Sequence, residues 1–81
     1  MSQHEKLVRR LKAEPSDFAW TELKALLSGF GYVEAKGKGS RRKFKCDGRD
    51  VIILHEPHPR RTLPNYAVRQ LIMKLKDEDL I

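Results

Sequence analysis

The chain has 81 residues, a net charge of +6 and one cysteine. A chain of this length forms one domain with a single modest core, because folding buries only about three-fifths of the unfolded surface at this size. Cys46 alone excludes an internal disulfide, and no charged leader or long apolar stretch predicts secretion or membrane insertion. We therefore expect a cytoplasmic protein with one domain over residues 1–81.

Two stretches with helical spacing open the chain. From Gln3 to about Lys12, one histidine and three apolar residues recur at the i, i+3, i+4 and i+7 positions of one helical face, and Pro15 breaks the pattern. A second helix starts near Trp20, repeats the same spacing and ends at Gly31. We assign residues 1–15 to an N-terminal helical extension and residues 18–81 to the core of the domain.

Beyond the second helix the apolar period changes from 3.6 to 2, which is typical of strands. The predicted strands cover residues 32–36, 40–46 and 49–55. Asp47-Gly48 favours a two-residue type I′ turn between the last two strands. Such a turn places Phe44 opposite Val51 and Ser40 opposite His55. The residues that then share one face of the hairpin are Phe44, Cys46, Val51 and Ile53.

A third helix begins around Pro64 and ends between Lys76 and Asp79. The whole order is helix, helix, three strands, helix, which predicts an α+β fold with a three-stranded antiparallel sheet packed against helices. Without the first helix, α-β-β-β-α is also the layout of double-stranded-RNA-binding domains.

The third predicted strand contains four successive apolar residues, Val51 to Leu54. Such a run predicts a strand that is covered on both faces, whereas the helices after and before the sheet cover one face. Either the N-terminal helix crosses behind this strand or a protein partner covers it.

The positive charge is concentrated in one segment. Residues 36–49 hold seven cationic side chains and one acid, while the other 67 residues hold ten of each. A solvated face explains a basic run most simply, but charge this concentrated favours a polyanion such as RNA. The candidate RNA-binding residues are Lys36, Lys38, Arg41, Arg42, Lys43 and Lys45.

Several motifs resemble the HicA toxins of bacterial toxin–antitoxin systems. They are GKGSRRKF at 37–44, the Asp-Gly hairpin, HEPHP at 55–59 and the helix after Pro64, and the similarity extends from about Trp20 to the C-terminus. The resemblance implies a double-stranded-RNA-binding-like ribonuclease that cuts messenger RNA and is neutralised by a HicB antitoxin. The family's signature is a Gly-Ser-His stretch followed closely by an aromatic or apolar residue. Gly39, Ser40 and Phe44 match it, but Arg41 stands where the resemblance implies a catalytic histidine.

This substitution changes the chemistry that the site can perform. RNA cleavage without a metal needs groups that accept and donate protons near neutral pH, which histidine does and arginine does not. Arg41 and Arg42 therefore suit phosphate binding. Proton transfer is left to His55, which the register places beside Ser40, and to His58; for each histidine alone, a structural place at a strand end or on a loop is the simpler interpretation.

We take His55, His58 and Ser40 as the candidate catalytic residues. The H-x-x-H spacing lacks the further ligands of a zinc site, so we expect no metal and no cofactor. Three functions fit the sequence: an RNA-cleaving toxin with a displaced histidine, an RNA-binding module without catalysis, and a subunit that binds an antitoxin. We favour a HicA-like toxin that binds messenger RNA and forms a complex, or a larger oligomer, with a HicB-like antitoxin, and leave cleavage open.

Overall fold

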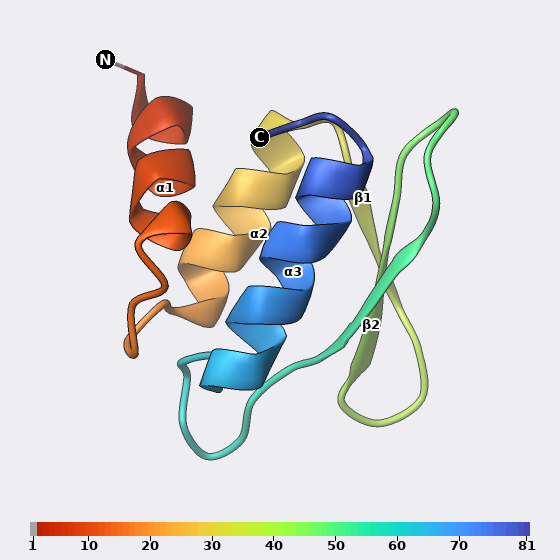
Figure 1. The fold of residues 1–81 in the computed structure, drawn as a ribbon. Helices are drawn as coiled ribbons and strands as arrows, with labels where there is room; N and C mark the ends of the chain where they lie inside the picture. Colours follow the sequence, from red (N-terminus) through yellow and green to blue (C-terminus); the bar gives the residue numbers. More distant parts are fainter. Residues whose placement is uncertain (1) are drawn as a thin grey trace.

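The structure is a computed structural model that describes residues 2–81. Its helices and strands follow the predicted α+β order of a helical extension and an α-β-β-β-α core (Figure 1). The elements are α1 (Gln3–Lys12), α2 (Trp20–Gly29), β1 (Val33–Lys36), β2 (Arg41–Lys45), β3 (Ile52–His55) and α3 (Asn65–Asp77). Within residues 2–81, no helix is both long and apolar enough to cross a lipid bilayer.

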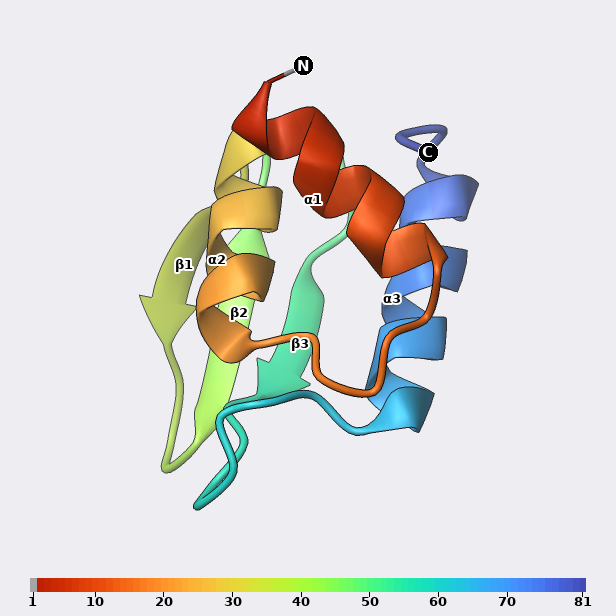
Figure 2. The same ribbon diagram turned by 90° about the vertical axis from the view of Figure 1, so that its left-hand side faces the viewer.

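The elements form three layers. The antiparallel sheet, in the order β1-β2-β3, makes the first layer. Helices α2 and α3 lie side by side against one face of this sheet, and α1 packs across the outer side of these two helices (Figures 1 and 2). Within residues 2–81, no helix or strand covers the opposite face of the sheet. Of the two explanations for the apolar run in the third strand, α1 crossing behind it is therefore wrong, and a protein partner remains.

The core lies between the sheet and the two inner helices and continues outward to α1. From the sheet it takes Phe44 and Ile52, which are 2% and 5% exposed. From α1 it takes Leu7 and Leu11, because the i, i+4 spacing turns both toward α2 and α3. The other large side chains that are buried in it are Phe18, Trp20, Leu23, Leu26, Leu27, Tyr32, Leu63, Val68, Leu71, Ile72 and Leu75.

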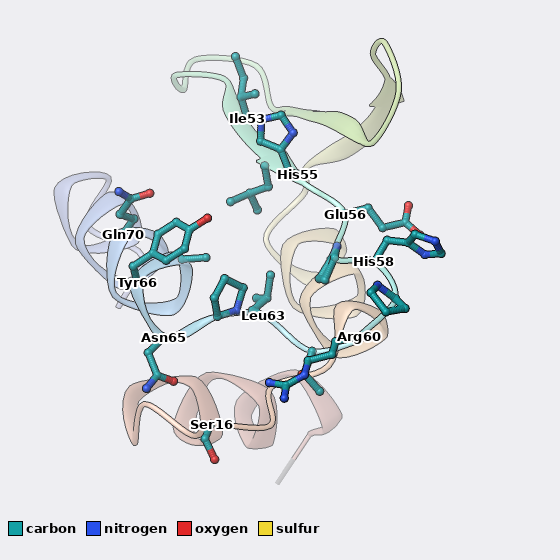
Figure 3. Close-up of a pocket in the computed structure, with 16 residues that line it drawn as sticks. Ser16, Ile53, His55, Glu56, His58, Arg60, Leu63, Asn65, Tyr66 and Gln70 are labelled. Carbon is teal, nitrogen blue, oxygen red and sulfur yellow. The ribbon is translucent and has the colours of Figure 1, made fainter.

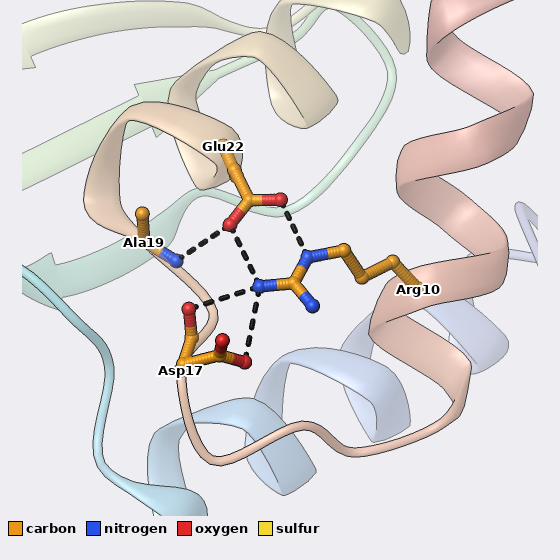
Figure 4. Close-up of polar contacts among 4 residues, drawn as sticks. All are labelled: Arg10, Asp17, Ala19 and Glu22. Carbon is orange, nitrogen blue, oxygen red and sulfur yellow. Dashed lines mark hydrogen bonds and ion pairs between the residues drawn. The ribbon is translucent and has the colours of Figure 1, made fainter.

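A charged cluster joins α1 to the start of α2 (Figure 4). The Arg10 guanidinium donates from Nε to Glu22 Oε2 at 2.6 Å and from Nη2 to Glu22 Oε1 at 3.1 Å. The same Nη2 donates to the carbonyl and the carboxylate of Asp17. Glu22 Oε1 also accepts from the Ala19 N–H at 3.0 Å, which satisfies one free donor at the N-terminus of α2. These hydrogen bonds, the one from Arg10 first, lower the pKa of the Glu22 carboxyl.

The register of the β2–β3 hairpin differs from the prediction by one residue. Phe44 pairs with Ile52 instead of Val51, and Arg41 pairs with His55. A type I′ turn needs a positive φ at both central residues. Here Gly48 has φ 80°, but Asp47 is not among the residues with positive φ, and β3 begins only at Ile52. The longer connection explains the shift.

A shift of one residue exchanges the two faces of a strand. Ile52 and Leu54, not Val51 and Ile53, therefore lie on the helix side with Phe44. Val51 is 42% exposed and Ile53 is 46% exposed. The prediction that these two residues share the face of Phe44 is wrong, and the face of β3 that carries Ile53 is open.

Candidate nucleic-acid interface

Strand β2 separates its side chains between the two faces of the sheet. Phe44 points into the core, so the alternation of a strand places Arg41, Lys43 and Lys45 together on the open face. Within residues 2–81, none of these three cations lies within ion-pair distance of a carboxylate. The open face of the sheet thus carries a row of three cations, which we call the cation row.

Arg42 has a different environment from the cation row. Its side chain is 16% exposed and lies 3.9 Å from the Glu34 carboxylate and 3.3 Å from that of Glu56. Its Nη1 also donates to the carbonyls of Gly39 and Arg41, each at 2.8 Å. Arg42 therefore fixes the β1–β2 loop to the end of β3. A role of Arg42 in RNA binding stays a prediction, and a phosphate would have to compete with two carboxylates.

Two further predicted RNA-binding residues, Lys36 and Lys38, are exposed where β1 passes into the loop before β2. The loop is closed by backbone hydrogen bonds from Gly37 to the Arg41 carbonyl at 2.9 Å and from Arg41 to the Lys38 carbonyl at 3.1 Å. Gly39 has φ 60°, a conformation that glycine adopts without strain. Ser40 follows this glycine and directly precedes Arg41, the first residue of the cation row.

Arg49 shows that not every cation of the basic segment is free. Its Nη1 donates to the Phe30 carbonyl at 2.9 Å and lies 3.3 Å from the Cys46 sulfur. Arg49 therefore holds the β2–β3 turn against the end of α2.

The structure brings Ser40, Arg41 and His55 together. His55 is directly opposite Arg41 in the ladder, and its Nδ1 lies 3.4 Å from Ser40 Oγ, which is longer than an ideal hydrogen bond. The Glu56 N–H donates to the Ser40 carbonyl at 2.8 Å. The predicted proximity of His55 to Ser40 and Arg41 is confirmed, although its ladder partner is Arg41 and not Ser40.

A groove of about 830 Å³ begins at His55 and extends over the loop that follows β3 to the first turns of α3 (Figure 3). Its wall residues include Ile53, His55, His58, Arg60, Tyr66 and Gln70. In the view of Figure 3, His58 and Tyr66 lie on opposite sides of the groove. Both predicted histidines therefore line one groove, but only His55 also adjoins the cation row.

The loop under this groove is held by the segment before α2. The Trp20 N–H donates to the Arg61 carbonyl and the Leu63 N–H donates to the Phe18 carbonyl, both at 2.8 Å. Leu63 is 2% exposed and anchors the loop in the core. His58 thus stands on a loop that is fixed at its far end, whereas His55 is the last residue of β3.

Tyr66 and Gln70 are residues of the groove that the sequence analysis did not single out. They lie four residues apart on α3, outside its apolar stripe, and Tyr66 is 67% exposed. A large aromatic residue on the polar face of an amphipathic helix is the sequence signal that points to them. Residues 2–81 contain no group of three or more histidine, cysteine or acidic side chains placed to hold a metal ion.

Comparison with known families identifies the class of protein. The family described as HicA toxin of bacterial toxin–antitoxin systems matches residues 20–77, from the first residue of α2 to the last residue of α3. The fold and this match, which covers more than half of the chain, define the toxin component of a toxin–antitoxin pair. The chain belongs to the HicA toxin family. No curated protein and no solved structure is significantly similar to it.

Proposed function

We propose that this HicA family toxin binds messenger RNA on the open face of its sheet and cleaves it without a metal, with His55 as the proton-transfer group. The observation that carries the proposal is the cation row beside His55. Three cations at alternate positions of one strand repeat about every 6.6–6.8 Å. They can contact successive phosphates without competing with carboxylates of the protein.

The roles at the site follow from charge and reach. Arg41 binds the phosphate beside the bond that breaks, because its planar guanidinium can donate two hydrogen bonds to one phosphate. His55, opposite Arg41, takes or gives the proton. Ser40 Oγ, 3.4 Å from His55 Nδ1, orients the imidazole ring. His58, which lines the same groove, is the candidate for the second group of the acid–base pair, with a smaller share of the rate than His55.

A HicB-like antitoxin is the proposed partner. The match with a toxin family implies that an antitoxin exists, and the open face carries the features that such a protein would cover. Beside the cation row lie two apolar side chains, Val33, which is 70% exposed, and Ile53. An acidic protein with an apolar centre is complementary to this face, and by covering it would exclude RNA.

Binding of labelled RNA over a range of salt concentrations tests the proposal. We expect the logarithm of the affinity to fall linearly with the logarithm of the salt concentration, because each phosphate contact releases counterions. Cleavage of the same RNA in the presence of a chelator tests catalysis separately. Failure to bind at low salt would remove RNA from the function, whereas binding without cleavage would leave an RNA-binding module.

A further inference from the structure

The groove beside His55 combines an apolar floor with polar groups on its rim. Leu63, which is 2% exposed, and Ala67, which is 7% exposed, contribute to the floor. Tyr66, Gln70 and Asn65 stand on the rim. The volume of about 830 Å³ lies in the range of small-molecule sites, about 300–1,000 Å³.

Tyr66 and Gln70 lie on the same side of this groove. They are four residues apart on α3, so one helical turn places them on the same face. Figure 3 shows the Tyr66 ring between Gln70 and the chain that carries Leu63, with its hydroxyl directed toward the side of the groove where Ile53 and His55 lie. The ring offers a flat apolar surface, and the amide of Gln70 offers a donor and an acceptor next to it.

The groove is continuous with the proposed phosphate site. His55 belongs to both, since it lines the groove and pairs with Arg41 across the ladder. Arg60 supplies a cation on the groove wall, and the one wall carboxylate, that of Glu56, already pairs with Arg42 at 3.3 Å. A ligand in the groove therefore meets both a cation and an aromatic ring on its walls.

We infer that this groove binds one unpaired base of the RNA, with the base stacked on Tyr66 and its edge hydrogen-bonded by Gln70. The inference rests on the proposed function and names its substrate class as single-stranded RNA. A base within a duplex is stacked on both faces and paired along one edge, so it cannot enter a groove between a sheet edge and a helix. A strand whose phosphates follow the cation row can turn one base into the groove at His55.

The groove also sets the nucleotide next to which the chain is cut. His55 is the candidate catalytic residue that both lines the groove and adjoins the cation row, so it stands between the bound base and the bound phosphates. Tyr66 then contributes affinity for any base, because every base has a face that stacks on an aromatic ring. Gln70 contributes the preference among bases, because only the base edges differ in donors and acceptors.

The test compares single-stranded oligoribonucleotides of A, C or U with a blunt RNA duplex of equal length. Fluorescence anisotropy of the labelled RNA gives the dissociation constant and its salt dependence. We expect Tyr66→Ala to weaken single-strand binding by about tenfold at every salt concentration, leaving the salt slope and duplex binding unchanged. Gln70→Ala should reduce the differences in affinity among A, C and U.

Two control variants separate stacking from general surface effects. Tyr66→Phe keeps the ring and should retain most of the affinity for single strands. Met73→Ala removes a side chain of α3 that is 66% exposed, almost the same as Tyr66 at 67%, but lies outside the groove, and it should change nothing. Equal thermal midpoints for all variants would show that the fold is intact.

The outcomes distinguish this inference from the proposed function. If the wild type binds RNA but Tyr66→Ala binds all single strands equally well, the base site is wrong and the proposed function stands. If Tyr66→Ala instead loses only the antitoxin, the groove is a protein-docking site and the inference is overturned. If the wild type binds no RNA at low salt, the proposed function falls and the base site with it.

Discussion

Arg41 and His55 are directly opposed residues of β2 and β3, so a permanently charged guanidinium and an imidazole lie side by side on the same face of the sheet. Both side chains are exposed, and Ser40 adjoins the imidazole at 3.4 Å. This pairing offers a phosphate-binding group and a proton-transfer group at neighbouring positions. The family's Gly-Ser-His signature implies a catalytic histidine at position 41. In the proposed mechanism His55 replaces that histidine, and Arg41 binds the phosphate.

The first prediction concerns His55. Replacing His55 by alanine should lower the rate of RNA cleavage by about 100-fold or more, because a general acid or base contributes about 10²–10⁴ to a rate. RNA affinity should change little, because a neutral imidazole contributes little to phosphate binding. The measurement is single-turnover cleavage in chelator together with anisotropy binding.

His58→Ala and Arg41→His complete this experiment. His58→Ala should have a smaller effect than His55→Ala, because His58 lies on the loop after β3 and not in the strand that pairs with the cation row. Arg41→His should raise the rate by placing a second imidazole opposite His55 while removing one phosphate contact. Unchanged cleavage by both alanine variants would contradict the displaced-histidine mechanism.

Arg41 and Arg42 should respond differently to the same substitution. Arg41→Gln should reduce the salt slope of RNA binding by about one unit without changing stability, because its side chain is exposed and has no carboxylate partner among residues 2–81. Arg42→Gln should lower the free energy of unfolding by about 1–2 kcal/mol, because it removes the ion pairs to Glu34 and Glu56. Urea unfolding and salt-dependent binding of both variants would show whether the two effects separate; equal changes in the salt slope would place Arg42 among the RNA contacts.

The register of β3 can be tested by stability alone. Ile52→Ala should lower the free energy of unfolding by about 2–5 kcal/mol, because Ile52 is 5% exposed and packs in the core. Ile53→Ala should cost much less, within about 1 kcal/mol, because Ile53 is 46% exposed on the open face. Urea unfolding of the two variants measures the difference. The reverse order of destabilisation would restore the register that the Asp-Gly turn suggests.

The helices could be predicted from the sequence because each carries an apolar stripe with a 3.6-residue period. The stripe of α1 predicts Gln3–Lys12, the range found in the structure. The strand register could not be predicted in the same way, because it depends on the backbone conformation of Asp47. The dipeptide Asp-Gly is compatible with more than one turn, and Val51 to Leu54 are apolar at every position. Because these four residues do not alternate with polar ones, the sequence does not show which of them face the core.

The candidate site was predictable in position but not in detail. The basic segment and His55 meet as expected, since a hairpin brings its two ends together whatever the register. That Arg42 is held by Glu34 and Glu56 depends on three separate segments, so no local pattern reveals it. The groove with Tyr66 likewise depends on how α3 lies beside β3, and no residue spacing encodes that.

The Glu22 carboxylate should make stability depend on pH. Its pKa is lowered in the folded protein, first by the hydrogen bond from Arg10, so it stabilises the fold above its unfolded pKa of about 4.3. This contribution should be lost as the pH falls below about 4. Glu22→Gln should therefore lower stability by about 1 kcal/mol at pH 7 and by much less at pH 3. Thermal unfolding across this pH range, with the exposed Glu5→Gln as the matched control, measures the effect; an equal loss at both pH values would contradict it.

The last prediction concerns the antitoxin and the open face of the sheet. If an acidic HicB-like protein covers the cation row, the co-expressed complex should not bind RNA, because both ligands need the same face. Ile53→Asp should weaken this complex, since it replaces an apolar contact by a negative charge that the acidic partner repels. Met73→Asp places the same charge at an exposed position of α3 outside the open face and should leave the complex intact. Size-exclusion chromatography and competition with labelled RNA provide the readouts, and a ternary complex containing RNA would show that the antitoxin acts from another surface.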